Sequence, residues 1–200
     1  MKYMSKLLHT LVGLALSVVP LVASAQDHPA DHWEFAVEAG YLAKVRNNSP
    51  HDYRIAPTQV VWRTPAAYKL WESEDGSRLV VRNRTAVVLE SIVRGPEDVY
   101  FAFAGAPSFE LWHKNQKTAL FYEIGGGIGL INVKKVEGAQ GQARTFNWFT
   151  QLGVRHKITP TLSIMGAGYF THHSNQGATN PNPGIDVLGV NFGLIWQLGK

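Results

Sequence analysis

The segment from Tyr169 to Gly189, with the sequence YFTHHSNQGATNPNPGIDVLG, contains a histidine, a serine two residues later and an acid beyond a short loop. In a β-strand, side chains two residues apart lie on the same face, so His172 and Ser174 would stand side by side if this segment is extended. The Asn, Gly and Pro residues that follow favour a turn, which would bring Asp186 at the start of the next strand close to the imidazole. The spacing predicts a base, a nucleophile and an acid on one hairpin.

These residue types are the ones that ester hydrolysis needs. A serine hydroxyl is a poor nucleophile until a base takes its proton; His172 can do so, while Asp186 can hold the imidazole tautomer and stabilise its cation. Asn182 and the backbone N–H of Gly177 can then stabilise an oxyanion. Taken alone, an H-x-S pattern followed by an acid also fits polar residues near a loop that have no catalytic role. The spacing therefore leaves both readings open.

The first residues of the chain have the composition of a signal peptide. Two lysines precede an apolar run at residues 7–22, and Ala-Ser-Ala at residues 23–25 provides the small residues that a signal peptidase requires. We therefore expect a cleaved signal peptide at residues 1–25 and a single exported domain at residues 26–200. An uncleaved anchor formed by this run is the alternative. Nothing later in the sequence approaches the roughly 18 continuous apolar residues of a spanning helix.

Composition excludes several classes of protein. The formal net charge of +4 falls to +2 when the two lysines of the signal peptide are removed, so we expect no nucleic-acid partner. The chain has no cysteine, which disfavours the small disulfide-stapled scaffolds common among exported proteins. The roughly 175 residues that remain are enough for one small barrel.

From Trp33 onward, extended stretches alternate with turn residues, and no helical period is sustained. We expect strands at residues 33–41, 53–63, 79–94, 98–113, 119–133, 146–158, 162–173 and 185–197. The number is even, and several strands are long enough for a tilted membrane crossing. This pattern predicts an all-β fold, an eight-stranded antiparallel up-and-down outer-membrane β-barrel. A soluble barrel or sandwich is the alternative, because one apolar face also suits a water-soluble core.

The last expected strand divides most clearly into two faces. One face carries only apolar side chains, and the residues between them are mainly small or polar. The apolar side chains are Leu188, Val190, Phe192, Leu194 and Trp196. We expect this face to contact lipid. The same alternation places His172, Ser174 and Asp186 on the outside of the barrel, where polar groups cost free energy unless they lie near an interface or take part in chemistry.

Tryptophans occur mostly near the ends of the expected strands. They are Trp62, Trp71, Trp112, Trp148 and Trp196. This distribution is typical of the aromatic girdles of outer-membrane barrels. Packing in an aromatic core is an equally good explanation for any single one of them.

Two further patterns suggest ligand sites but have simpler explanations. The glycines at 125–127 and 129 lie within an expected strand rather than at a strand-to-helix junction, so we attribute them to curvature and exclude nucleotide binding. The histidines and aspartates at residues 27, 28, 31 and 32 could hold a metal, but we expect a solvated N-terminus and assign no metal site.

The motif H-H-S-N-Q-G followed by N-P-N-P-G-I-D, which spans residues 172–186, resembles that of the lipid A 3-O-deacylases of the PagL type. These are eight-stranded outer-membrane barrels, also called acyloxyacyl hydrolases, and the strand pattern of most of the chain is loosely similar to theirs. The resemblance implies that His172 is the base, Ser174 the nucleophile and Asp186 the acid of a catalytic triad.

The resemblance also implies roles for the loop between the two strands. Gly177 and Asn182 match the oxyanion donors of the family, and Asn175 matches the asparagine that organises the loop. The acid here is Asp186, whereas the best-known members have Glu at this position. A second imidazole, His173, stands between base and nucleophile, and the i,i+2 geometry favours His172 as the base.

The function that the resemblance implies is hydrolysis of an ester-linked acyl chain of lipid A. Its substrate would be lipopolysaccharide in the outer leaflet of the outer membrane, its product a free fatty acid, and it would need no metal or organic cofactor. A homodimer is left open. The rival interpretation is a non-catalytic small barrel that serves adhesion or envelope integrity.

Overall fold

A computed structural model describes residues 28–46 and 49–199, and the expected signal peptide at residues 1–25 lies outside the described residues. The strands are β1 (Glu34–Arg46), β2 (Arg54–Arg63), β3 (Tyr68–Glu72), β4 (Arg78–Arg94), β5 (Val99–Trp112), β6 (Thr118–Ile131), β7 (Arg144–Lys157), β8 (Leu162–Ser174) and β9 (Ile185–Gln197). Among the described residues, no helix has the length and apolar character to cross a membrane.

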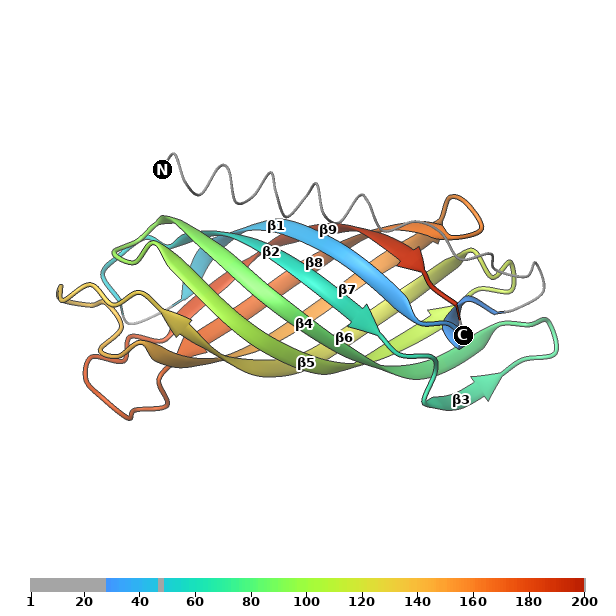
Figure 1. The fold of residues 1–200 in the computed structure, drawn as a ribbon, viewed down its shortest axis with the longest axis horizontal. Helices are drawn as coiled ribbons and strands as arrows, with labels where there is room; N and C mark the ends of the chain where they lie inside the picture. Colours follow the sequence, from blue (N-terminus) through green and yellow to red (C-terminus); the bar gives the residue numbers. More distant parts are fainter. Residues whose placement is uncertain (1–27, 47–48, 200) are drawn as a thin grey trace.

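Eight of these strands close into an antiparallel barrel (Figure 1). β1 pairs with β2 on one side and with β9 on the other, β2 pairs with β4, and each strand from β4 to β8 pairs with the next strand along the chain. The predicted eight-stranded fold is confirmed. Its loops at residues 95–98, 132–143 and 175–184 lie together at one end, which we call the loop end, and β1 begins and β9 ends at the other, the termini end.

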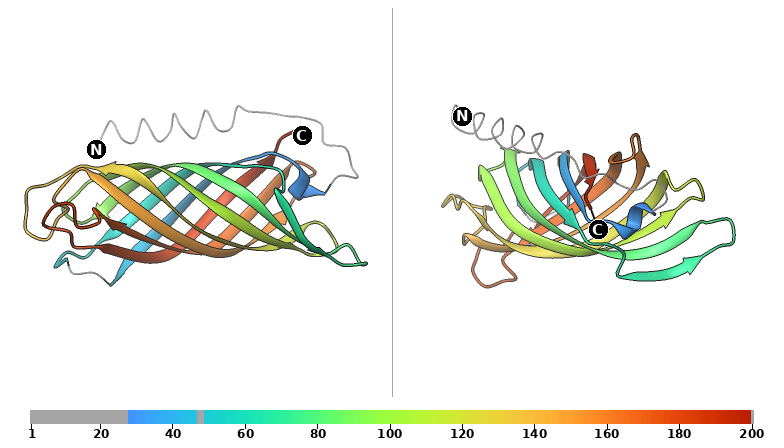
Figure 2. Two further views of the ribbon diagram at one scale, coloured as in Figure 1. Left: turned by 90° about the horizontal axis from the view of Figure 1, so that it is seen from below. Right: turned by 45° about the vertical axis from the view of Figure 1, so that its right-hand side comes forward.

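β3 is a ninth strand that the sequence pattern did not predict. It pairs only with the start of β4, where Tyr68 lies opposite Val81 and Glu72 opposite Arg78. With the turn at residues 73–77 it projects beyond the barrel at the termini end (Figure 2). All five of its residues are exposed, so no alternation of buried and exposed side chains distinguishes it from a loop.

The two faces of the barrel have the polarity predicted for a membrane barrel. On β9, Phe192 points outward and is 60% exposed, whereas Asn191 points inward and is fully buried. β8 alternates in the same way, with Tyr169 and His173 inside and His172 outside. An apolar exterior around a polar interior is the reverse of a water-soluble barrel.

Charged side chains that pair with one another occupy the barrel interior. In one cluster, Arg155 and Arg82 bind the two oxygens of Glu34 at 2.5 and 2.8 Å. In a second cluster, Glu123 accepts a hydrogen bond from Arg63 at 3.1 Å and forms an ion pair with Arg84 at 2.9 Å. The remaining carboxylates of the two clusters are Glu110 and Glu38. A buried charge is tolerated only when it is paired and hydrogen-bonded, so these clusters make the lumen a packed core.

The prediction of a solvated N-terminus is wrong for the described residues. A short 3-10 turn at Pro29–Asp31 packs into the barrel at the termini end, and Ala30 and His28 are buried there. His28 Nδ1 accepts a hydrogen bond from the backbone N–H of Ala30 at 3.1 Å. Burial, aided by the charge of Arg78, lowers the pKa of His28 to about 4, so the imidazole is neutral at neutral pH. Asp27 lies outside the described residues.

The tryptophans separate into two groups. Trp62 and Trp148 lie on the outer surface and are 40% and 46% exposed, as expected of a girdle. Trp112 is fully buried inside the barrel, where the Arg155 guanidinium lies 4.8 Å from the centre of its ring. The girdle assignment is therefore wrong for Trp112, which packs as a core residue.

Candidate active site

The β8–β9 hairpin brings His172 and Asp186 together. They lie directly opposite each other in the strand register, and His172 Nδ1 is 2.5 Å from Asp186 Oδ1. Both side chains are about one quarter exposed and point to the outer face of the barrel. A carboxylate can only accept, so the proton of this hydrogen bond is on Nδ1 and the lone pair of the neutral ring is on Nε2.

Ser174 is the last residue of β8 and lies on the same outward face as His172. It is half-buried, opposite Phe146 of β7. Within residues 28–46 and 49–199, the Ser174 hydroxyl makes no hydrogen bond, so it is not committed to a structural partner. The hairpin thus places a hydroxyl, an imidazole with Nε2 as its basic nitrogen and a carboxylate on one outward face near the loop end.

Asn175 is the centre of the hydrogen bonds in the loop between the two strands. Its side chain is buried, and Nδ2 donates to the backbone oxygens of Thr179 and Pro181 at 2.9 and 3.3 Å. Its Oδ1 accepts from the N–H of Gly177 at 2.9 Å, and its own N–H donates to Asn182 Oδ1 at 2.9 Å. Hydrogen bonds of this one residue therefore connect the loop from Gly177 to Asn182.

The two residues expected to be oxyanion donors differ in their freedom to donate. The amide nitrogen of Asn182 makes no hydrogen bond within the part of the chain that the structure describes, because only its oxygen binds Asn175. The N–H of Gly177 is already bound to Asn175 Oδ1. Gly177 adopts a φ of +75°, which favours glycine, and its N–H would have to be shared with or released from Asn175 to reach a ligand.

Three residues beside the hairpin were not identified from the sequence as part of the site. Trp148 faces His172 across the β7–β8 pair, with ring centroids 6.2 Å apart, and makes a tilted ring contact with Phe170 at 4.9 Å. Gly184 lies against the imidazole, because a Cβ there would be 3.3 Å from His172 Cε1. Their contacts depend on strand register, which the sequence does not show. The one signal in the sequence was the strand alternation that places Trp148 on the outer face.

His173 lies on the opposite side of β8, inside the barrel. It is 1% exposed, and its Nε2 is 3.1 Å from Glu90 Oε2. Its ring packs edge-on against Tyr100 with centroids 4.7 Å apart. The two adjacent imidazoles are thus separated by the wall of the barrel, and His172 is the one on the face that carries Ser174.

No metal site accompanies this arrangement in the described residues, since no three His, Cys, Asp or Glu side chains there form a group that could hold an ion. Fold and hairpin together define the class, a small outer-membrane-type β-barrel with hydrolase-like residues on its outer face.

Comparison with known proteins identifies the family. A family model described as lipid A 3-O-deacylase (PagL) matches residues 51–194, and the chain belongs to this family. A search of curated proteins by sequence found no match.

Two solved structures have a similar fold. The crystal structure of the outer-membrane enzyme PagL matches with a TM-score of 0.55 and 16% identity over 80% of this chain and 97% of that one. The crystal structure of Neisserial surface protein A matches with a TM-score of 0.50 and 9% identity over 83% of this chain and 97% of that one. The fold and the family point to the bacterial outer membrane.

Proposed function

We propose that this protein is an outer-membrane serine esterase that hydrolyses an ester-linked acyl chain of lipid A, at the 3-O position that the family description names. The observation that carries the proposal is the hydrogen bond between His172 and Asp186 on the same outward face as Ser174. Ionisable groups on the lipid-facing surface of a barrel are costly, so a paired His and Asp there favour a chemical role.

The proposed reaction begins when Ser174 Oγ attacks the ester carbonyl while its proton passes to His172 Nε2. Asp186 stabilises the imidazolium, and the Asn182 amide donates to the oxyanion, with Gly177 as the second donor. The bond between the carbonyl carbon and the sugar oxygen breaks as His172 returns the proton to that oxygen. Water then attacks the acyl-serine while its proton passes to His172. The bond between the acyl carbon and Ser174 Oγ breaks as His172 returns the proton to Oγ, and a free fatty acid is released.

The position of the hairpin supports access by lipid. With the termini in the periplasm, as is usual for such barrels, the loop end faces outward and the hairpin lies at the level of the outer leaflet. That leaflet contains lipopolysaccharide. An outward-facing site lets the acyl chain stay in the hydrocarbon while its ester reaches Ser174.

Mass spectrometry of lipid A from cells with and without the protein tests this function. We expect the protein to cause the loss of one ester-linked acyl chain, and Ser174→Ala and His172→Ala each to lower the rate by about 10⁴-fold or more. Ser163→Ala, which changes a serine on the inner face of β8, is the matched control and should remain active.

Heat-modifiable gel mobility would show that each variant is folded. Unchanged lipid A in the presence of folded wild-type protein would favour the non-catalytic barrel. Loss of activity in His173→Ala but not in His172→Ala would reverse the assignment of the base.

A further inference from the structure

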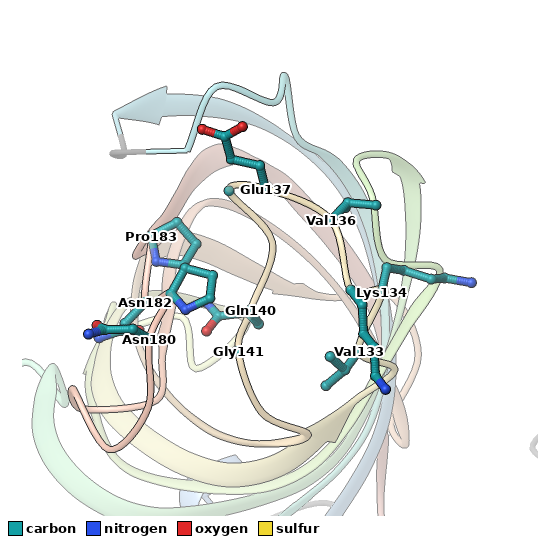
Figure 3. A pocket seen from close by; sticks show the side chains of 12 residues that line it. Val133, Lys134, Val136, Glu137, Gln140, Gly141, Asn180, Asn182 and Pro183 are labelled. Carbon is teal, nitrogen blue, oxygen red and sulfur yellow. The ribbon is translucent and has the colours of Figure 1, made fainter.

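A groove of about 830 Å³ lies at the loop end, between the β6–β7 loop and the β8–β9 loop (Figure 3). The β6–β7 loop contributes residues 133–138, 140 and 141, and the β8–β9 loop contributes residues 180–183. The proposed chemistry uses none of the β6–β7 residues. The groove is therefore a second feature of the loop end.

The groove is adjacent to the candidate active site, because the two share a residue. Asn182, the proposed oxyanion donor, also lines the groove. The two loops are joined there by a hydrogen bond from the Gly141 N–H to the Pro181 carbonyl oxygen at 2.9 Å. A ligand whose ester reached Ser174 could therefore extend its polar part into the groove.

Gln140 is an unpaired polar side chain in the wall of this groove. It is 1% exposed, and neither atom of its side-chain amide has a hydrogen-bond partner among the described residues. Its backbone is held firmly, because its N–H donates to Glu97 Oε1 at 2.8 Å and Tyr53 donates to the other oxygen of Glu97 at 2.8 Å. A buried amide without a partner costs free energy, which a ligand that donates and accepts hydrogen bonds would recover.

The groove also contains a lysine without a partner. Lys134 pairs with Asp98, whereas Lys135 is exposed and makes no hydrogen bond or ion pair within the described residues. Lys135 therefore offers a charge with no carboxylate of the described residues within ion-pair distance, and Glu137 is the acidic residue of the groove lining. A phosphate group is a suitable partner for such an ammonium.

We propose that this groove binds the phosphorylated glucosamine head group of lipid A, with Lys135 binding a phosphate and the Gln140 amide binding a hydroxyl or amide group of the sugar. The inference rests on the proposed function, since it names the part of the substrate that the loops hold while the acyl chain stays on the outer wall. It makes the β6–β7 loop a determinant of specificity.

The test uses the full protein in detergent micelles with three substrates. These are phosphorylated lipid A, the same lipid A after removal of its phosphates, and a short-chain p-nitrophenyl ester that has neither sugar nor phosphate. The kinetic parameters kcat and KM are measured for each substrate. Folding of each variant is checked by heat-modifiable gel mobility.

Lys135→Gln should raise KM for phosphorylated lipid A about tenfold, the effect of losing one charged hydrogen bond, and leave the other two substrates unaffected. Lys117→Gln removes the same charge from the turn before β6 at the termini end and should leave KM unchanged for all three substrates. An unchanged KM for phosphorylated lipid A in Lys135→Gln would overturn the phosphate assignment. So would an equal rise for the dephosphorylated substrate.

Gln140→Leu keeps the size of the side chain and the backbone hydrogen bond to Glu97, so the loop should remain folded. It should raise KM for both forms of lipid A by about threefold or more and leave the p-nitrophenyl ester unaffected. Equal KM values for lipid A in Gln140→Leu and wild type would overturn the role of Gln140. If wild-type protein cleaves no lipid A, the proposed function itself is wrong, and the assignment of the lipid A head group to the groove is wrong as well.

Discussion

At the scale of single residues, the acid of the hairpin differs by one methylene group from the Glu that the best-known relatives carry. The 2.5 Å contact shows that the shorter side chain reaches the imidazole, because the strand register sets the two residues directly opposite each other.

Asp186→Glu should therefore retain substantial deacylase activity, whereas Asp186→Asn should lose about 10⁴-fold, since it removes the charge that stabilises the imidazolium and permits the wrong tautomer. Fatty-acid release from lipid A across neutral pH measures both. Equal activity of Asp186→Asn and wild type would show that Asp186 is not the acid of a triad.

At the scale of elements, the β6–β7 loop connects the other loops of this end. Ser49 donates to the Gly138 carbonyl oxygen at 2.8 Å, Gln140 binds Glu97, and Gly141 binds Pro181. The β8–β9 loop is thus supported from inside by Asn175 and from outside by the β6–β7 loop.

Gly141→Ala tests this support. A Cβ at residue 141 would lie 2.7 Å from the Asn180 oxygen and 2.9 Å from the Pro181 nitrogen, both backbone atoms, so the β8–β9 loop must move. We expect kcat for lipid A to fall about tenfold or more, because a small misplacement of an oxyanion donor is costly.

Gly168→Ala is the matched control for Gly141→Ala. It adds the same methyl group to the outer face of β8, where no atom of the residues that the structure describes lies within 4 Å. Both variants should keep the heat-modifiable mobility of a folded barrel. Wild-type kcat in Gly141→Ala would mean that the loop contact does not position the site.

At the scale of the whole molecule, stability depends on compensated charge in the lumen. Glu123 forms ion pairs with Arg63 and Arg84, and all three side chains are almost completely buried. Removing the charge of Glu123 leaves Arg63 and Arg84 to share Glu38, so one buried positive charge is no longer compensated, which costs more than the intact pairs contribute.

Glu123→Gln should therefore lower the free energy of unfolding by about 3–5 kcal/mol. Urea unfolding in micelles, followed by tryptophan fluorescence, measures the loss. Glu72→Gln breaks exposed pairs with Lys69 and Arg78 on the projecting hairpin and should leave the free energy of unfolding almost unchanged, because exposed ion pairs are screened by solvent. Similar losses in the two variants would show that the lumen does not depend on its charge pairs.

The sequence by itself determined the eight barrel strands, the outward face of β9 and the proximity of His172 to Asp186. Each of these follows from the period of two in a strand and from turn residues that act locally, so a short window of sequence is sufficient. The exterior placement of Ser174 follows from the same alternation.

Only the tertiary structure decided the burial of Trp112 and His28, the β3 strand and the groove beside Gln140. These depend on which strands continue beyond their neighbours and on how loops far apart in the chain meet. Gln140 and Pro183, both in the groove wall, are separated by two strands and have no shared local pattern. Closure of the barrel brings such residues together, because each strand pair adds its own register and stagger, and their sum is fixed only when β9 meets β1.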